Sequence, residues 1–138
     1  VRRQRRHQDW YGIHSMTTAD WRPMAPDESA IVRAILSSPG IPEGEALLRE
    51  LDGALVRNSA TWILDIQVAA SGTSTTSIPD GPFPARAFVS ENGHYQGEII
   101  VWITAGHISG LEFAWVTDEP PTRWPQAQEM DIEVKGGQ

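Results

Sequence analysis

The hydrophobic residues of this chain repeat with a helical period in its first third and with a strand period afterwards. Residues 26–37 carry an apolar stripe at helical spacing, and Ser37-Ser38-Pro39-Gly40 ends it. Pro26 has the backbone angle of a first helical position, and the two acidic residues after it favour the positive end of the helix dipole. A second, shorter helix is predicted from Pro42 until Asp52-Gly53 closes it. Both helices are amphipathic, so each needs a surface to cover.

From residue 54 onwards, apolar and polar side chains alternate as in half-buried strands. Asn92-Gly93 predicts a tight hairpin turn, and Ala105-Gly106-His107 predicts the next one. The Ser-, Thr-, Gly- and Pro-rich segment 69–84 breaks the alternation, which predicts a long loop that is either mobile or functional. Strands are predicted over residues 54–57, 62–68, 85–90, 95–103, 108–117 and 130–134.

Helices followed by hairpin-connected strands predict an α+β fold, with two N-terminal helices packed on one face of an antiparallel sheet of about five strands, a β-meander. This single domain is expected over residues 21–135. Residues 1–20 show no hydrophobic period and predict a disordered arm, with Met16 as an alternative start. The strands at 99–103 and 111–116 are apolar on both faces, so a loop or a second subunit is expected on the side away from the helices, and a homodimer is predicted.

Composition narrows the class of protein. A length of 138 residues with 40% hydrophobic content fits one compact domain. The absence of cysteine excludes disulfides, a thiolate nucleophile and cysteine-based metal sites. No apolar run approaches the roughly 20 residues that cross a bilayer, and no apolar segment follows the first arginines as in a secretory signal. A cytoplasmic protein without a membrane segment is predicted.

The charge is unevenly distributed along the chain. Of its 11 Lys and Arg residues, four lie in the first six positions, which leaves seven against 18 acidic residues elsewhere. An acidic body repels nucleic-acid phosphates and is steered toward a basic protein partner. The arginine cluster is the alternative, as an arm that touches nucleic acid or an acidic membrane surface, but it lacks a folded basic face.

Candidate chemistry is sparse. Asp118 and Glu119, with Glu112 and His107, form the best acid–base set, but an extended strand of roughly 30 Å separates His107 from the carboxylate pair. A polar strand end before Pro120-Pro121 explains that pair equally well. No histidines have the spacing of a metal site, and neither a nucleophile elbow nor a phosphate-binding glycine loop occurs. The sequence therefore predicts no catalytic residue, no metal and no cofactor.

Tryptophan is frequent, with six in the chain. Trp62, Trp102 and Trp115 lie within predicted strands, where packing between elements explains them. Trp124 follows the double proline in Thr122-Arg123-Trp124-Pro125. It either anchors that loop against the sheet edge or forms an exposed hot spot for a protein partner.

Several short motifs resemble a group of small actinobacterial proteins of unknown function. The resemblance rests on Trp21-Arg22-Pro23 with the Pro-Asp-Glu helix start, on Gly97-Glu98 and Leu111-Glu112, and on the pattern from Asp118-Glu119-Pro120-Pro121-Thr122 to Trp124-Pro125. It covers most of residues 21–135. The resemblance implies no activity. Some members carry a cysteine-rich segment between the first two strands, where this chain has Asn58-Ser59-Ala60-Thr61.

Together these features predict a small protein-binding module of immunity-protein or antitoxin-like inhibitor type. A basic partner is attracted electrostatically and docks around Asp118, Glu119, Arg123 and Trp124. The alternative is a small hydrolase or ligand-binding protein that uses Glu112, Asp118 and one histidine in a pocket between the sheet and loop 70–84. Nucleic-acid binding through the arginine arm is the third hypothesis.

Overall fold

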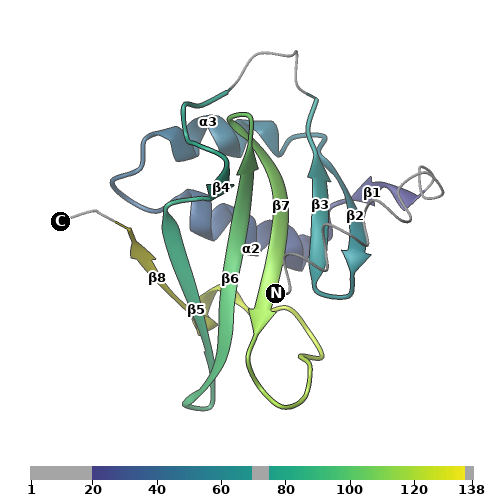
Figure 1. Cartoon of the computed structure of the whole chain (residues 1–138), viewed down its shortest axis with the longest axis vertical. Coiled ribbons are helices and arrows are strands. Elements are labelled where there is room, and N and C mark those ends of the chain that lie inside the picture. The colour runs from purple at the N-terminus through teal and green to yellow at the C-terminus, as the bar shows by residue number, and fades with distance from the viewer. Residues whose placement is uncertain (1–19, 70–74, 136–138) are drawn as a thin grey trace.

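The structure, a computed structural model, describes residues 20–69 and 75–135. It contains helices α2 (Pro26–Leu36) and α3 (Glu43–Glu50), a short 3-10 helix η3 (Ala127–Glu129) and one antiparallel sheet (Figure 1). The predicted α+β composition, two helices with an antiparallel sheet, is confirmed. Apart from Asp20, the predicted N-terminal arm lies outside the described residues.

The sheet has eight strands in the described residues, so the prediction of about five was wrong. Two of the additional strands, β1 and β4, are two residues long and cannot show an alternating pattern. The strands are β1 (Arg22–Pro23), β2 (Leu55–Ala60), β3 (Ile63–Gln67), β4 (Gly81–Pro82), β5 (Ala85–Glu91), β6 (His94–Thr104), β7 (His107–Trp115) and β8 (Met130–Val134).

The strand order is β1-β2-β3-β7-β6-β5-β8, and β4 pairs with β6 beyond the end of β5. Strands β5, β6 and β7 form the predicted meander, but β3 pairs with β7 and β8 returns to β5. Both hairpin turns of the meander are where the sequence placed them. Asn92 and Gly93 have φ of 54° and 78°, and Ala105 and Gly106 have φ of 55° and 79°, the paired positive values of a type I′ turn.

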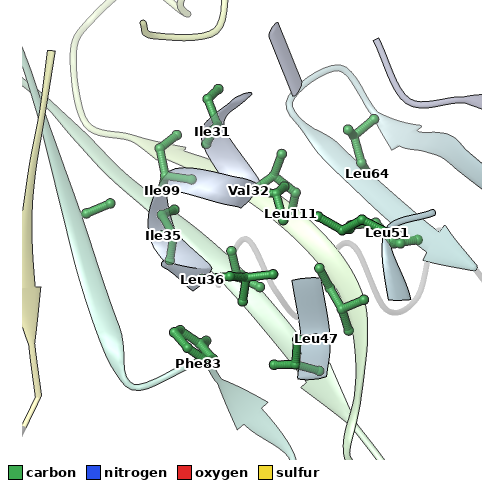
Figure 2. Packing of buried hydrophobic residues seen from close by; sticks show 14 of the residues in the cluster. Ile31, Val32, Ile35, Leu36, Leu47, Leu51, Leu64, Phe83, Ile99 and Leu111 are labelled. Carbon is green, nitrogen blue, oxygen red and sulfur yellow. The ribbon is translucent and has the colours of Figure 1, made fainter. Parts of the chain in front are cut away.

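One face of the sheet forms the hydrophobic core together with the helices. Along β6, Ile99, Val101 and Ile103 are at most 1% exposed. Their side chains join a cluster with Leu111 on β7 and with the apolar stripes of both helices, which lie behind the sheet in Figure 1 and around Leu111 in Figure 2. The helical members of the cluster include Ile31, Val32, Ile35, Leu36 and Leu47.

The two helices approach each other closely at Gly44. A Cβ atom at this position would overlap the backbone carbonyl oxygen of Leu36, the last residue of α2. Gly44 is buried, and Phe83 lies against the same point. A residue without a side chain is therefore required for this packing.

The remaining residues of the strands point to the opposite side, here called the outer face. By register, Glu98, Ile100 and Trp102 of β6 lie beside Ala114, Glu112 and Gly110 of β7. On the next strand, β3, Ile63 lies beside Glu112 and Asp65 lies beside Gly110. Asp65 in turn lies beside Arg57 of β2. The outer face therefore mixes apolar, aromatic and charged side chains, whereas the opposite side of β6 carries the buried Ile99, Val101 and Ile103.

Candidate functional site

A groove of about 1030 Å³ runs along the outer face where segment 77–84 meets β5, β6 and β7. Its floor includes Ile100, Trp102 and Ala114, which are all partly exposed. Segment 77–84 forms one wall because Phe83 donates its backbone N–H to the Val101 carbonyl oxygen at 2.8 Å. The groove is thus a concave, largely apolar surface with charged residues around it, the usual composition of a binding site.

Glu112 lies in this groove and is only 2% exposed. Its Oε1 atom accepts a hydrogen bond of 3.1 Å from the indole Nε1–H of Trp102. Among the ion pairs formed between described residues, none includes Glu112. A carboxylate removed from water with no opposite charge beside it is costly, and an arriving cation would relieve that cost.

Arg86 and Glu98 face each other at the β5 side of the groove. Two hydrogen bonds of 3.1 Å join the guanidinium of Arg86 to both carboxylate oxygens of Glu98, and these bonds raise the pKa of Arg86. The same guanidinium lies 4.7 Å from the centre of the Phe88 ring. Arginine, carboxylate and aromatic ring therefore form one unit at this edge.

A second unit of the same type lies on β2 and β3. Arg57 pairs with Asp65 at 3.3 Å and lies 4.5 Å from the centre of the Trp21 ring. Both charged residues are at most 7% exposed. The outer face thus holds two arginines, the buried Arg57 and the exposed Arg86, each beside a carboxylate and an aromatic ring.

The four residues that were predicted to bind a partner differ in their exposure and in their contacts. Asp118 and Glu119 are exposed just beyond the end of β7. Arg123 binds Glu129 and Glu91 of its own chain at 2.8 and 3.1 Å. The hydrogen bond from Arg123 lowers the pKa of Glu129 to about 2. A second hydrogen bond, from the backbone N–H of Gln126, acts in the same direction.

Trp124 is 8% exposed and points into the molecule. Its ring stacks on Phe113 with 6.2 Å between the ring centres and meets Trp62 edge-on at 5.2 Å. This is the loop-anchor arrangement of the two that the sequence left open. At this loop the indole of Trp124 is therefore buried, whereas Asp118 and Glu119 are exposed.

His107 is placed far from Asp118, since the two lie at opposite ends of β7. Its Nδ1 atom contacts the carboxylate of Glu50, the last residue of α3, and lies 3.0 Å from the Thr75 hydroxyl. The other oxygen of Glu50 accepts the backbone N–H of Ile108 at 3.1 Å. This cluster fastens the end of α3 to the start of β7. No spacing in the sequence joins residues 57 positions apart, so the pair was missed.

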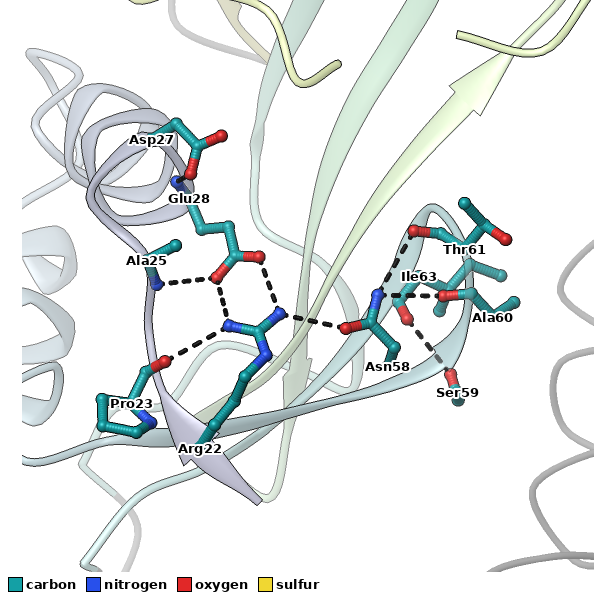
Figure 3. A network of polar contacts seen from close by, with 10 residues as sticks. All are labelled: Arg22, Pro23, Ala25, Asp27, Glu28, Asn58, Ser59, Ala60, Thr61 and Ile63. Carbon is teal, nitrogen blue, oxygen red and sulfur yellow. Dashed lines mark hydrogen bonds and ion pairs between the residues drawn. The ribbon is translucent and has the colours of Figure 1, made fainter. Parts of the chain in front are cut away.

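A further polar network fixes the first strand to the first helix (Figure 3). Arg22 on β1 donates to both carboxylate oxygens of Glu28 at 3.0 and 2.9 Å and to Asn58 on β2 at 3.0 Å. Glu28 also accepts the backbone N–H of Ala25 at 2.8 Å, which satisfies a donor before the helix. The hydrogen bond with Glu28 raises the pKa of Arg22. Each group in the network binds another part of this chain, so its role is structural.

Two further findings concern residues 20–69 and 75–135 alone. They contain no group of three or more His, Asp or Glu side chains arranged to hold a metal ion. None of their helices has the length and apolar character needed to pass through a membrane.

Comparison of the chain with protein-family models, with curated proteins and with solved structures found no match. The resemblance to small actinobacterial proteins therefore stays a prediction, and the case for a function rests on the site itself.

Sequence reasoning missed most of the groove. Trp102 was assigned to packing, Arg86 was not singled out, and Glu98 was noted only as part of the Gly97-Glu98 motif. One signal was present, since β6 carries apolar residues on both of its faces. It indicated a covered or binding surface, and the alternative hypothesis placed a pocket with Glu112 between the sheet and loop 70–84.

Proposed function

We propose that this protein is a protein-binding module of the immunity-protein or antitoxin-like inhibitor type, which acts by docking on a basic partner. The observation that carries the proposal is the outer face, where a groove with an aromatic floor is surrounded by more carboxylates than cations. Asp80, Asp131 and Glu133 are exposed near or on this face and form no ion pair with another described residue. Apolar anchors within a charged rim are typical of protein interfaces.

Charge supports a basic partner. The whole chain has a formal charge of −7, although four arginines lie within its first six residues. Four of the arginines among the described residues, Arg22, Arg57, Arg86 and Arg123, are already paired with carboxylates of the same chain. The remaining carboxylates attract a cationic surface and accelerate association. Asp118 and Glu119 contribute to this attraction from the end of β7.

The test begins with partners captured by the full chain and identified, and continues with the purified pair. Association rates are measured at several salt concentrations for the wild type and for a variant with Asp118→Ala and Glu119→Ala. We expect slower association for the variant and a rate that falls with salt in both. A rate independent of salt, or a captured partner with an acidic surface, would contradict the proposal.

The second candidate function is binding of a small ligand in the same groove. Its volume of about 1030 Å³ and the buried Glu112 favour it. Among the described residues that line the groove there is neither a histidine nor Asp118, so ligand binding is favoured over hydrolysis. A thermal-shift screen of small cationic and apolar compounds tests it, and loss of the shift in Glu112→Gln would place the ligand.

Self-association and a cytoplasmic location also stay predictions. Sedimentation velocity at two protein concentrations tests the first, and a single concentration-independent monomer would contradict it. Fractionation of the producing cells tests the second.

A further inference from the structure

We infer that the free edge of β8 accepts an extended segment of the basic partner as an additional antiparallel strand, with basic side chains of that segment beside Asp131 and Glu133. The inference rests on the proposed function, because it names the backbone surface and the side chains by which a basic partner is recognised. It concerns a different surface from the Asp118–Glu119 turn and from the groove.

Strand β8 ends the sheet, and within the described part of the chain it pairs with β5 alone (Figure 1). A strand with one unpaired side presents backbone donors and acceptors that another chain can bind. The opposite end of the sheet offers less, because β1 is two residues long and its Arg22 binds Glu28 and Asn58. With five residues, β8 is the longer of the two end strands.

The register of β8 decides which of its residues face the free edge. Lys135 donates its backbone N–H to the Pro84 carbonyl oxygen at 2.9 Å, on the side of β5. Along an antiparallel ladder, residues that bond to the neighbouring strand alternate with residues whose backbone groups face the other way. Asp131 and Glu133 therefore bond to β5, whereas Ile132 and Val134 direct their N–H and C=O groups to the free edge.

The side chains of β8 alternate between the two faces of the sheet. Met130 and Ile132 are partly buried and pack against the core cluster. Asp131 and Glu133 are exposed on the outer face, and neither forms an ion pair with another described residue. An added antiparallel strand places one of its residues directly beside each of these positions. Apolar residues of that strand continue the core face, and basic residues are favoured beside the two carboxylates.

The charges of β8 also limit which strand can bind. A second copy of this chain, added with Ile132 opposite Ile132, places Asp131 opposite Glu133 on both sides, and like charges directly opposite each other are destabilising. Lys135, two residues after Glu133, repels a further basic residue at the end of the strand. The segment that fits is therefore a short basic–apolar–basic stretch in extended conformation rather than a long basic run.

The experiment titrates the full chain with a capped peptide, Thr-Lys-Val-Lys-Thr, and follows the backbone amide signals by NMR. We expect saturable shifts centred on Ile132 and Val134. Replacing both lysines of the peptide by glutamate should weaken the response roughly tenfold or more, because two attractive pairs become repulsive. Equal responses to the two peptides would overturn the inference. Shifts of these two amides that depend on protein concentration without any peptide would place a second copy on the edge and overturn it as well.

Two N-methylated peptides test the backbone contact. In the antiparallel arrangement, the N–H of the peptide's valine faces β8, and the N–H of each lysine faces away from it. A methyl group on the valine nitrogen should therefore weaken binding roughly tenfold or more, while one on the nitrogen of the second lysine should change it by less than about twofold. Equal effects of the two methyl groups would rule out strand addition.

Two double variants with the same change of charge locate the site. Asp131→Asn with Glu133→Gln should weaken binding of the lysine peptide roughly threefold to tenfold, because two attractive cross-strand pairs are lost. Asp52→Asn with Glu45→Gln, at exposed positions in and after α3, should change it by less than about twofold. All four residues are exposed, so both variants are expected to fold, as judged by their amide spectra. The opposite order of the two effects would contradict docking at β8.

Failure of the two proposals can be distinguished. If the purified basic partner binds the variant with Asp131→Asn and Glu133→Gln as tightly as the wild type, the proposed function survives and docking at β8 is wrong. If the lysine peptide binds at β8 as expected but no basic partner exists, the β8 site stands and the inhibitor function is wrong.

Discussion

The two faces of the central strands differ in burial and composition, although alternate residues of the same strands form them. On β6, the side facing the helices carries Ile99, Val101 and Ile103, at most 1% exposed, whereas Ile100 and Trp102 between them are half-buried on the outer face. The first face is selected for volume and close packing. The second combines an apolar floor with charged side chains around it, a composition that is common in binding sites.

The largest expected effect is on the helix-covered face. Leu111→Ala removes a side chain that is 0% exposed at the centre of the core cluster, and we expect a loss of about 3 kcal/mol in the free energy of unfolding. Ile100→Ala on the outer face should cost about 1 kcal/mol, because the residue is partly exposed. Urea denaturation measures both. Equal losses would show that the outer face is a second core.

A smaller difference in stability is expected when each of two buried carboxylates of the outer face is replaced by its amide. Asp65→Asn leaves the buried Arg57 beside a neutral amide, and we expect a loss of about 2 kcal/mol. Glu112→Gln keeps an acceptor for Trp102 and removes a charge that forms no ion pair within the described residues, so its stability should stay within about 1 kcal/mol of the wild type. Thermal unfolding of both variants checks the order. A greater loss for Glu112→Gln would mean that its charge is stabilising.

The helix layer itself can be tested at Gly44. Replacing glycine by alanine inside a helix ordinarily stabilises it by up to about 1 kcal/mol. Here the new Cβ would overlap the Leu36 carbonyl oxygen, so we expect a net loss of about 1 to 2 kcal/mol in Gly44→Ala. Glu45→Ala, the exposed neighbour in the same helix, is the control and should be nearly neutral. A stabilised Gly44→Ala would show that the two helices are not in close contact.

The smallest effect belongs to the exposed pair beside the Trp124 loop. Arg123 lowers the pKa of Glu129 from 4.5 to about 2, so the pair's contribution to stability is complete above pH 4.5 and is lost as the pH falls toward 2. Arg123→Met should return the pKa of Glu129 toward its ordinary value, which a carboxyl NMR titration measures directly. The accompanying loss of stability at neutral pH should be small, since the pair is solvent-screened. An unchanged titration midpoint would contradict the pairing.

Local chemistry explains what was predictable. The helix predicted over 26–37 is α2 at Pro26–Leu36, and the one that begins at Pro42 is α3 at Glu43–Glu50. Proline, glycine and an apolar stripe act within a few residues of each other, so they can be interpreted without the rest of the chain. The Asn92-Gly93 hairpin follows for the same reason, because the positive φ values favour those residues.

The sequence alone therefore determined the two helices, the longer strands, their order along the chain and the acidic charge of the body. Only the tertiary structure decided that β3 lies beside β7, that Glu50 meets His107, that Trp124 is buried, and that Trp102 and Glu112 share one groove with segment 77–84. The alternation of apolar and polar residues predicts which side of a strand each residue occupies, but it does not predict which strand will lie beside it. That choice depends on contacts between distant residues, whose free energy exists only once the whole sheet has formed.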